Sequence, residues 1–317
     1  MTVRRRAVFL GSGAFAVPVL DALAVAPEVT LVGVVTAPPR PAGRGHRQTD
    51  SPVGGRAAVL GLPTLTPERL RAPEAVAAVT DLAPELLVLA DYGQLVPSML
   101  LDLPRYGALN LHPSLLPRHR GAAPIPAAIL AGDLETGVTL MRMDAGLDSG
   151  PVVAQRGIPL TGRETAPQLE VALAVLAAEL LATSLRGWLA GELPAVAQPA
   201  EGATLTRPLR REDGRLDPHL PGVELERRVR ALQPWPGTFA ETGAGRLILW
   251  AAQPFPGTAA EPGAIVADGD GLALGVADGT LRLLEVQLGG GRRMSGANLR
   301  RGHPDLLGSR IHPATLG

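Results

Sequence analysis

Three side chains in the central part of the chain could together promote acyl transfer: Asn110, His112 and Asp148. An amide N–H and an imidazole N–H can both donate hydrogen bonds to an oxyanion. A nearby carboxylate can orient or charge the imidazole and help to remove the proton from an attacking amine. The sequence contains no Cys and no Gly-x-Ser-x-Gly turn that would present a nucleophile. We therefore predict that these three residues are catalytic and that they act without a covalent intermediate.

The elements around these residues are expected to form part of an α/β sheet. Alternation in Ala108–Leu111 predicts a strand whose polar face carries Asn110 and His112. Pro113 and Pro117 prevent a helix from following directly, so the strand enters an ordered loop. Ligands bind at the carboxyl edge of open α/β sheets, and we expect this strand end and the end of a second strand to meet there. The segments that follow the loop are a helix, the second strand and a Gly-rich turn, over Ala123–Ala131, Gly137–Met143 and Asp144–Gly150.

The longer pattern around the Asn-x-His pair is more specific than the pair itself, which taken alone is more often part of a hydrogen-bonded loop. The pair continues into SLLPRHRGAAP and then reaches Asp148 in the segment LDSG. This string resembles the formyltetrahydrofolate-dependent formyltransferases, and the similarity extends from LGSGAFAVPVLDAL to MSGANLRRG. The resemblance implies transfer of a formyl group from 10-formyltetrahydrofolate, the donor cosubstrate, to an amine, with no metal. The chain is most similar to those members that formylate the α-amine of methionyl initiator tRNA in bacterial-type translation initiation.

The resemblance also implies which residues contact the two substrates. In the family, backbone groups of two segments bind the folate, and a loop similar to RPAGRG enters the acceptor stem of the initiator tRNA. This chain has such a loop between Thr36 and Ala57. The folate-binding residues expected are Ser114, Leu115, Leu116, Pro117, Met141, Asp144, Gly146 and Leu147. The tRNA-binding residues expected are Arg40, Arg44, Arg47, Arg207, Arg292 and Arg293.

The composition of the Arg-rich segments by itself leaves their role open. The loop 36–57 is rich in Pro and Gly, and a solvated surface loop would have the same composition as a nucleic-acid arm. The segment GGGRRMSGANLRRG could likewise be a solvated turn or a face that follows RNA phosphates. Three residues depart from the family pattern: Arg47 stands where Lys is usual, Asp91 where the pattern is closer to Ala, and Pro218 where Trp is typical.

The overall composition indicates a two-domain protein with no general affinity for polyanions. The 317 residues exceed the usual size of one domain, and 46% of them are hydrophobic. The 30 basic residues, all of them Arg, balance 30 acidic ones, so any contact with RNA must rest on local clusters. No apolar run reaches about 18 residues. We therefore expect no membrane span, a cytoplasmic location and a monomer.

The order of apolar segments predicts two domains joined by a linker. A Rossmann-like, doubly wound α/β sheet is expected in residues 1–190, as the catalytic domain. Residues 191–206 are rich in Pro and Gly and are typical of a linker. Short strands at near-regular spacing predict a smaller, OB-like β-barrel in residues 207–317, and the resemblance implies that this domain binds tRNA.

Three other functions would account for parts of the sequence. The GSGAFA turn after the first strand fits a dinucleotide-dependent oxidoreductase, although the next strand ends at Thr36 and not at the acid that a ribose would need. A formyltransferase acting on a small amine, such as a nucleotide intermediate or an amino sugar, would share the site but would not need the barrel. An RNA-binding module without chemistry would use only the barrel and the Arg-rich loop.

Overall fold

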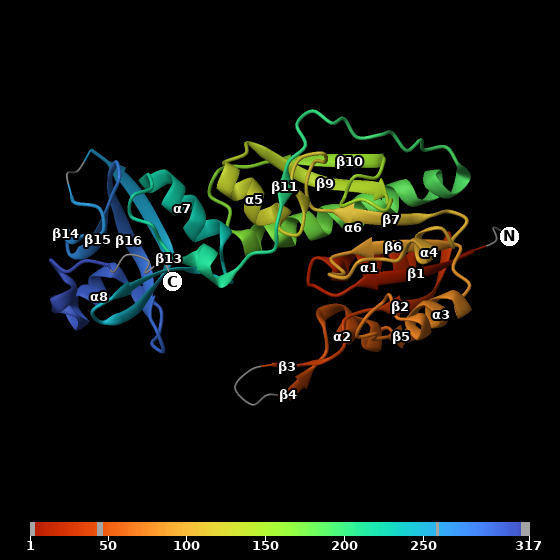
Figure 1. Ribbon diagram of the computed structural model, residues 1–317, viewed down its shortest axis with the longest axis horizontal. Coiled ribbons are helices and arrows are strands. Elements are labelled where there is room, and N and C mark those ends of the chain that lie inside the picture. Colours follow the sequence, from red (N-terminus) through yellow and green to blue (C-terminus); the bar gives the residue numbers. More distant parts are fainter. Residues whose placement is uncertain (1–3, 43–46, 258–259, 312–317) are drawn as a thin grey trace. The chain divides into compact units, whose positions relative to one another are not determined.

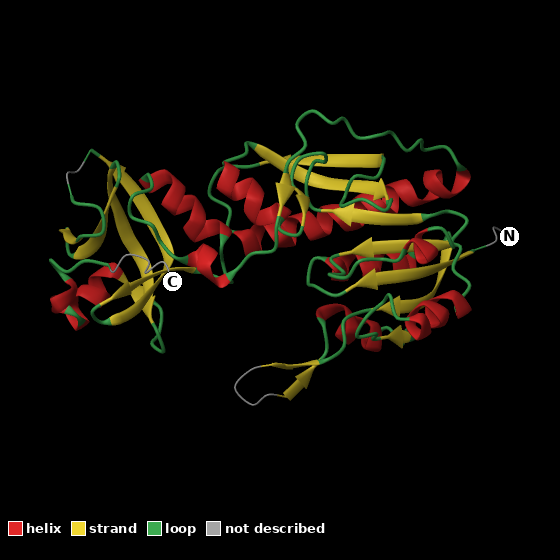
Figure 2. Cartoon of the chain, in the orientation of Figure 1, coloured by secondary structure: helices red, strands yellow, loops and turns green. Residues whose placement is uncertain are grey.

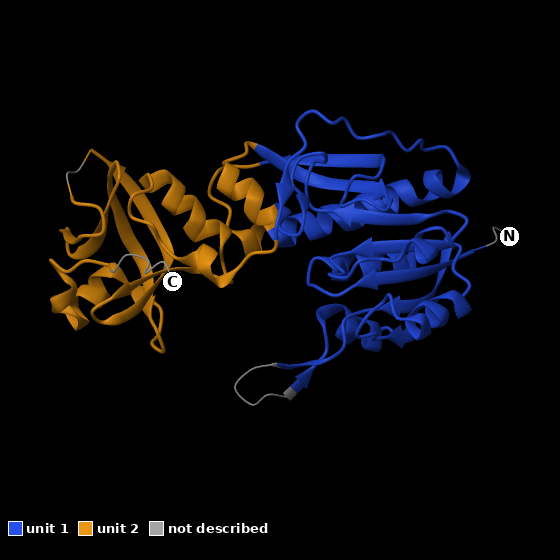
Figure 3. Ribbon diagram, in the orientation of Figure 1, with its two compact units in different colours: residues 1–124, 135–159, 170–207 blue, residues 125–134, 160–169, 208–317 orange. Residues whose placement is uncertain are grey.

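The computed structural model describes residues 4–42, 47–257 and 260–311. The chain divides into two compact units (Figure 3). Unit 1 comprises residues 1–124, 135–159 and 170–207, and unit 2 comprises residues 125–134, 160–169 and 208–317. A large mixed sheet with helices dominates unit 1, and an antiparallel sheet dominates unit 2 (Figure 2).

The sheet of unit 1 (Figure 1) has seven strands, in the order β10 (Val152–Pro159), β9 (Glu135–Arg142), β7 (Ala108–His112), β6 (Leu86–Ala90), β1 (Arg5–Gly11), β2 (Val29–Val35) and β5 (Thr64–Leu65). The five strands from β7 to β5 run parallel, whereas β9 is antiparallel to β7 and β10 is antiparallel to β9. The strand order reverses at β1, as in doubly wound folds. The predicted Rossmann-like α/β architecture is therefore confirmed.

Continuous apolar runs explain why the central strands are buried on both faces. Residues 7–11 of β1 and all of β6 are buried, as expected for parallel strands covered on both sides. The helices of unit 1 are α1 (Ala16–Val25), α2 (Pro52–Val59), α3 (Pro73–Asp81), α4 (Ser98–Leu101) and, from residue 170 onward, α6 (Ala166–Ala190). Helix α5 (Pro124–Ala131) leaves unit 1 after its first residue.

One helix begins later than its apolar pattern predicts. The pattern favours a helix over Pro67–Thr80, but α3 begins only at Pro73. The preceding loop is held by the Gln94 side chain, which accepts a hydrogen bond from the Leu70 N–H at 2.8 Å and donates one to the Pro67 carbonyl at 3.2 Å. These tertiary bonds compete with helical ones, so the first turn does not form.

Two short strand pairs lie outside the main sheet. The Arg-rich loop contains β3 (Arg40–Ala42) and β4 (Arg47–Thr49), which pair as an antiparallel hairpin. In the segment predicted to be a linker, β11 (Leu205–Thr206) pairs in parallel with β8 (Arg120–Gly121). The linker is therefore part of unit 1.

Helix α6 is long and apolar enough to cross a membrane by length and composition, although the sequence was expected to contain no such segment. Half of its apolar window is buried within the structure. The buried core helix of a globular protein passes the same test, so this helix is weak evidence for a membrane span.

The sheet of unit 2 has six antiparallel strands: β12 (Thr238–Thr242), β13 (Gly245–Pro256), β16 (Gly279–Leu288), β15 (Gly271–Val276) and β14 (Ile265–Asp268) in this order, with β17 (Met294–Ser295) paired to β16. The short strands predicted for the C-terminal part are confirmed, and they form an antiparallel sheet. Within the described parts of the chain, β12 and β14 are the two ends of this order and do not pair with each other. Closure into an OB-like barrel is therefore not confirmed.

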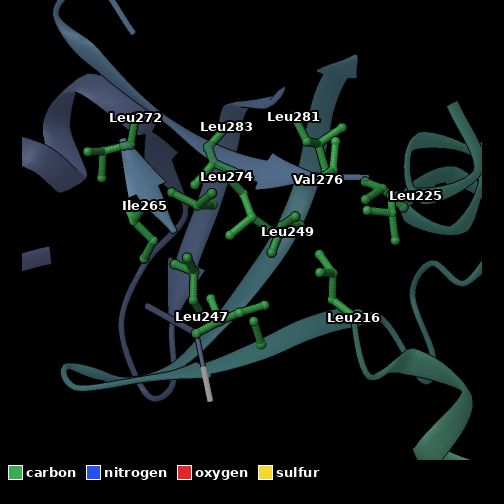
Figure 4. Packing of buried hydrophobic residues seen from close by; sticks show 14 of the residues in the cluster. Leu216, Leu225, Leu247, Leu249, Ile265, Leu272, Leu274, Val276, Leu281 and Leu283 are labelled. Carbon is green, nitrogen blue, oxygen red and sulfur yellow. The ribbon is translucent and has the colours of Figure 1, made fainter. Parts of the chain in front are cut away.

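Aliphatic side chains fill the core of unit 2 (Figure 4). Leu249 on β13, Leu281 on β16 and Leu274 on β15 are each 2% exposed or less. Helix α7 (Gly222–Ala231) adds Leu225, which is fully buried. Burying one such side chain contributes about 1.5–3 kcal/mol, so this cluster is the main source of stability for the sheet.

The Arg-rich segment near the C-terminus contains a helix that the sequence did not predict. Helix α8 (Gly296–Gly302) begins after Ser295, whose hydroxyl accepts a hydrogen bond from the Asn298 N–H at 3.2 Å. Ser is a favourable N-cap because it satisfies one of the free N–H groups of the first turn. Leu299 on this helix is fully buried in the core of unit 2, so tertiary packing holds the short helix in place.

Candidate active site

Strand β7 places Asn110 and His112 next to each other near its carboxyl end. Asn110 lies opposite Leu89 of β6 and Met141 of β9. The His112 side chain is 6% exposed, whereas Asn110 is half-buried. Asn110 is therefore only partly covered by protein, whereas the imidazole of His112 is largely enclosed.

Asp148 reaches His112 by a route that the sequence did not predict. We expected two strand ends to meet at one edge of the sheet, but β9 is antiparallel to β7, and its last residue, Arg142, lies opposite Leu109. The turn that follows β9 must therefore fold back along β7. It does so, and the Asp148 Oδ2 atom lies 3.6 Å from the His112 Nδ1 atom.

The conformation of Asp148 is unusual and is held by neighbouring groups. Its backbone φ is +48°, in the left-handed region that few residues other than glycine adopt. Its Oδ2 atom accepts a hydrogen bond from the Gly121 N–H at 2.8 Å. Such conformations persist where the surroundings fix them, and they cluster at functional sites.

Two contacts determine the protonation of His112. Its Nε2 atom lies 2.9 Å from the His119 carbonyl oxygen, which can only accept, so Nε2 carries a hydrogen. Burial lowers the pKa of His112, although the charge of Asp148 and the hydrogen bond to the His119 carbonyl act in the opposite direction. In the neutral ring the lone pair is on Nδ1, facing Asp148. His112 can therefore accept a proton there, and Nδ1 donates a hydrogen bond only after it has done so.

Several backbone groups of the loop after His112 are hydrogen-bonded to side chains of strands β9 and β10. The hydroxyl of Thr139, which is fully buried, donates to the Ser114 carbonyl at 2.6 Å and accepts from the Leu116 N–H at 3.0 Å. Gln155 donates to the Leu116 carbonyl at 2.8 Å. The Ser114 carbonyl and the N–H and carbonyl of Leu116 belong to residues that the resemblance assigned to folate binding. Their hydrogen bonds to Thr139 and Gln155 fix the loop between His112 and Pro117.

The turn that carries Asp148 is more open. Asp144 accepts hydrogen bonds from the Gly146 N–H at 2.9 Å and from the Ser149 hydroxyl at 3.1 Å. Leu147 is 55% exposed, whereas the Met141 side chain on the preceding strand is buried. Of the remaining residues predicted to bind folate, those of the turn are exposed, whereas Met141 lies in the core.

The glycine turn after β1 is occupied by the chain's own carboxylates. A Cβ on Gly13 would lie 1.6 Å from the Asp91 Oδ2 atom, and the Glu170 carboxylate accepts a hydrogen bond from the Phe15 N–H. Burial raises the pKa of Asp91. Burial and the charge of Asp91 raise the pKa of Glu170. A pyrophosphate bound at this turn would meet both acids, which disfavours a dinucleotide there.

The arginines predicted to bind tRNA lie on several elements. Arg40 and Arg47 are on the β3–β4 hairpin, and Arg207 is exposed after β11. Arg44 lies outside the described residues. In unit 2, Arg292 and Arg293 are exposed, and the Arg293 guanidinium stacks 3.3 Å from the centre of the Trp250 ring. A cation over an aromatic face is an attractive pairing, so Arg293 has a defined place on the surface.

Three polar residues of the predicted linker contact the site, although no sequence motif indicates them. Gln198, Thr204 and Thr206 hydrogen-bond to residues 117–123 and 148–150. A Gln and two Thr in a Pro-rich segment carry no motif, so no sequence signal would have singled them out.

Comparison with known proteins identifies the family. Residues 4–185 match the model of the formyl transferase domain, and residues 208–304 match that of the formyl transferase C-terminal domain. The chain is 44% identical over 306 residues to a methionyl-tRNA formyltransferase of Myxococcus xanthus, covering 96% of this chain and 97% of the relative. It is 42% identical to the protein of the same name from Aromatoleum aromaticum, covering 98% of both chains.

A solved structure supports the fold at lower similarity. HypX from Aquifex aeolicus, in complex with tetrahydrofolic acid, superposes with a TM-score of 0.62 at 16% identity, covering 94% of this chain and 47% of that one. At this identity the likeness concerns the fold alone. The family models and the relatives over nearly the full length are decisive, and the chain belongs to the formyl transferase family, in the branch of the methionyl-tRNA formyltransferases.

Proposed function

We propose that this chain is a cytoplasmic enzyme that transfers the formyl group of 10-formyltetrahydrofolate to the α-amine of methionyl initiator tRNA, in bacterial-type translation initiation. The names of relatives that match nearly the whole chain support the acceptor. The folate complex of the HypX structure supports the donor. The observation that carries the chemistry is a buried His112, with Nδ1 3.6 Å from Asp148 Oδ2, two residues after the half-buried Asn110 on the same strand.

Attack of the amine nitrogen on the formyl carbon forms the new C–N bond and places negative charge on the formyl oxygen. Asn110 donates an amide N–H to this oxygen. One such donor is typically worth about 3–4 kcal/mol, because it is already oriented toward the charge as it develops. His112 accepts the proton that the amine nitrogen loses, at Nδ1.

Asp148 makes this proton transfer favourable. Once Nδ1 is protonated, both ring N–H groups have an acceptor, since Nε2 faces the His119 carbonyl and Nδ1 faces the Asp148 carboxylate. The imidazolium then gives its Nδ1 proton to N10 of the folate. The bond between the formyl carbon and N10 breaks, so tetrahydrofolate leaves with the proton and the amine keeps the formyl group.

The folate is assigned to the loop after His112 and the open turn before Asp148. The exposed side chain of Leu147 supports this assignment, because it offers apolar surface to a flat ring. Hydrogen bonds from Thr139 and Gln155 give the loop a fixed shape against which a ligand can pack. The residues assigned are Ser114, Leu115, Leu116, Pro117, Met141, Asp144, Gly146 and Leu147.

The tRNA is assigned to a separate set of residues. In this proposal residues 1–190 are the catalytic domain, 191–206 the linker and 207–317 an OB-like tRNA-binding domain, a division that the matched family regions support. Exposed guanidinium groups suit phosphate oxygens and base edges. The residues assigned are Arg40, Arg44, Arg47, Arg207, Arg292 and Arg293.

Formylation assays with matched acceptors test the proposal. The purified chain is supplied with 10-formyltetrahydrofolate and with methionyl initiator tRNA, methionyl elongator tRNA or free methionine. We expect rapid formylation of the initiator species alone. Equal or faster formylation of free methionine or of the elongator tRNA would contradict the proposed acceptor, and no formylation of any of the three acceptors would contradict the proposed chemistry.

A further inference from the structure

We propose that Gln198, in the segment between the two matched family regions, is a positioning residue that holds Asp148 against His112. Its side-chain amide joins the two pieces of chain that meet at the Asp148–Gly121 hydrogen bond. This inference rests on the proposed function, because it concerns the same catalytic pair.

The contacts of Gln198 use both ends of its amide. The Nε2 atom donates to the Asp148 carbonyl at 2.9 Å and to the Gly150 carbonyl at 2.7 Å. The Oε1 atom accepts from the Arg120 guanidinium, with Nε at 3.0 Å and Nη2 at 2.7 Å. A single half-buried side chain therefore connects the turn that carries Asp148 to the residue before Gly121.

The turn needs such support because its backbone conformation is costly. A residue other than glycine in the left-handed region costs on the order of 1–3 kcal/mol, and Asp148 has a φ of +48°. The Gly121 N–H holds the carboxylate at 2.8 Å, and Gln198 holds the main chain of the same residue. Together these bonds fix both the carboxylate and the main chain of Asp148.

Thr204 and Thr206, in the same segment, fix the loop that follows His112. The His119 N–H donates to the Thr204 hydroxyl at 2.8 Å, and the His119 carbonyl is the acceptor for His112 Nε2. The Thr206 hydroxyl donates to the Arg120 carbonyl and accepts from the Ala123 N–H, each at 3.0 Å.

Gly121 is part of the same arrangement. A Cβ on Gly121, which has a φ of +101°, would lie 2.3 Å from the Thr206 carbonyl oxygen. This close approach lets β11 pair with β8. The segment 198–206 thus contacts the loop that follows His112, at residues 117–123, and the main chain at Asp148 and Gly150.

The chemistry of the position favours an amide over a charged group. Two carbonyls need a donor, and a guanidinium needs an acceptor, so Gln satisfies both. In Gln198→Glu the bond to Arg120 would become charge-assisted and stronger, but a carboxylate oxygen would face two carbonyl oxygens. Gln198→Glu therefore keeps the bond to Arg120 but loses the bonds to the carbonyls of Asp148 and Gly150. It distinguishes a role in binding Arg120 from a role in holding Asp148.

Steady-state kinetics of Gln198→Glu and Gln198→Ala, with Glu201→Ala as control, tests the proposal. Glu201 is an exposed residue of the same segment. We expect both Gln198 variants to lose kcat by a factor on the order of 10 to 100, as for small displacements of catalytic groups. KM for both substrates should change less than about twofold, and the control should match the wild type. Wild-type kcat in Gln198→Glu would overturn the proposal.

A second readout does not depend on turnover. NMR titration of His112 follows its pKa in the free protein, where Asp148 and His119 are the titratable neighbours of the ring. In Gln198→Ala we expect a lower midpoint, because the Asp148 carboxylate is no longer held near Nδ1. An unchanged midpoint would contradict the positioning role even if formylation itself were absent, so the two proposals fail separately.

A second pair of variants guards against misfolding of Gln198→Ala. Thr206→Ser keeps the hydroxyl that bonds Arg120 and Ala123, and Thr206→Val removes it. If the segment positions the site, Thr206→Val loses kcat and Thr206→Ser recovers it, with thermal unfolding recorded for both. Equal kcat in the two variants would overturn the role of the segment.

Discussion

The Nδ1 atom of His112 lies 3.6 Å from the Oδ2 atom of Asp148, although a helix and two strands separate the two residues in the chain. Because Nε2 faces a carbonyl oxygen, Nδ1 is the ring nitrogen that carries the lone pair. A carboxylate next to this lone pair stabilises the ring once it has accepted a proton. The pair is therefore suited to take a proton from an amine as it becomes an amide.

The titration of His112 should occur below its usual pH range. Burial lowers its pKa from the ordinary value of 6.5, so an NMR titration of the free protein should give a midpoint below 6.5. The resonance is assigned by its loss in His112→Gln. A midpoint above 6.5 would mean that Asp148 outweighs burial and that the resting ring is charged.

The same shift predicts how stability depends on pH. Below pH 6.5 the unfolded chain binds a proton at His112 that the folded chain resists, so the unfolding free energy falls as the pH falls from 6.5 to the folded pKa. The slope from this group is at most about 1.4 kcal/mol per pH unit. Denaturant unfolding of the wild type and of His112→Gln across this range should show this slope in the difference between the two unfolding free energies.

Removal of the amide of Asn110 should affect the transition state more than substrate binding. We expect Asn110→Ala to lower kcat by a factor of about 10² to 10³, the usual loss for one oxyanion donor, with little change in KM. Asn298→Ala is the matched control, since Asn298 is the only other Asn of the chain and lies on α8. A rise in KM at constant kcat would instead assign Asn110 to ground-state binding.

Arg293 should contribute to tRNA binding through charge. In Arg293→Ala we expect weaker binding of tRNA and a slope of log affinity against log salt that is smaller by about 1, as for the loss of one phosphate contact. The affinity for the folate should not change. Filter binding with Arg186→Ala, an exposed arginine on α6, provides the comparison. Equal salt slopes in the two variants would remove Arg293 from the RNA interface.

The acids at the glycine turn should limit stability at neutral pH. The folded pKa values of Asp91 and Glu170 are raised, so the folded chain binds protons more readily than the unfolded one, and stability falls as the pH rises from about 4.5. Glu170→Gln removes this loss and can still accept the bond from the Phe15 N–H. We expect a higher Tm than the wild type at pH 7 and a smaller difference at pH 4. A lower Tm at pH 7 would show that the charge itself stabilises the turn.

Local patterns predicted the N-terminal sheet well. Its buried strands are apolar runs such as Ala7–Leu10, and short turns separate them from helices. The period of the apolar pattern and the length of each run were therefore sufficient to predict these elements. The start of α3 was mispredicted because the bonds from Gln94 to its preceding loop come from a distant residue. Helix α8 was missed because it is short and depends on packing of Leu299.

The candidate site was predictable by residue type but not by geometry. The pattern from Asn110 to Asp148 indicated which side chains to examine. It did not show that β9 is antiparallel to β7, nor that the turn folds back to bring Asp148 to His112. Contacts from residues 198–206 also depend on tertiary structure, and nothing in their composition distinguishes them from an ordinary linker.

Single-turnover formylation of methionyl initiator tRNA by Asp148→Asn tests the central claim most directly. Asn has the same shape and can still accept the hydrogen bond from the Gly121 N–H, but it carries no charge to stabilise a protonated His112. We expect a formylation rate at least about 100-fold lower, with tRNA and folate binding close to wild type. A rate close to that of the wild type would contradict the claim that this pair accepts the proton of the amine.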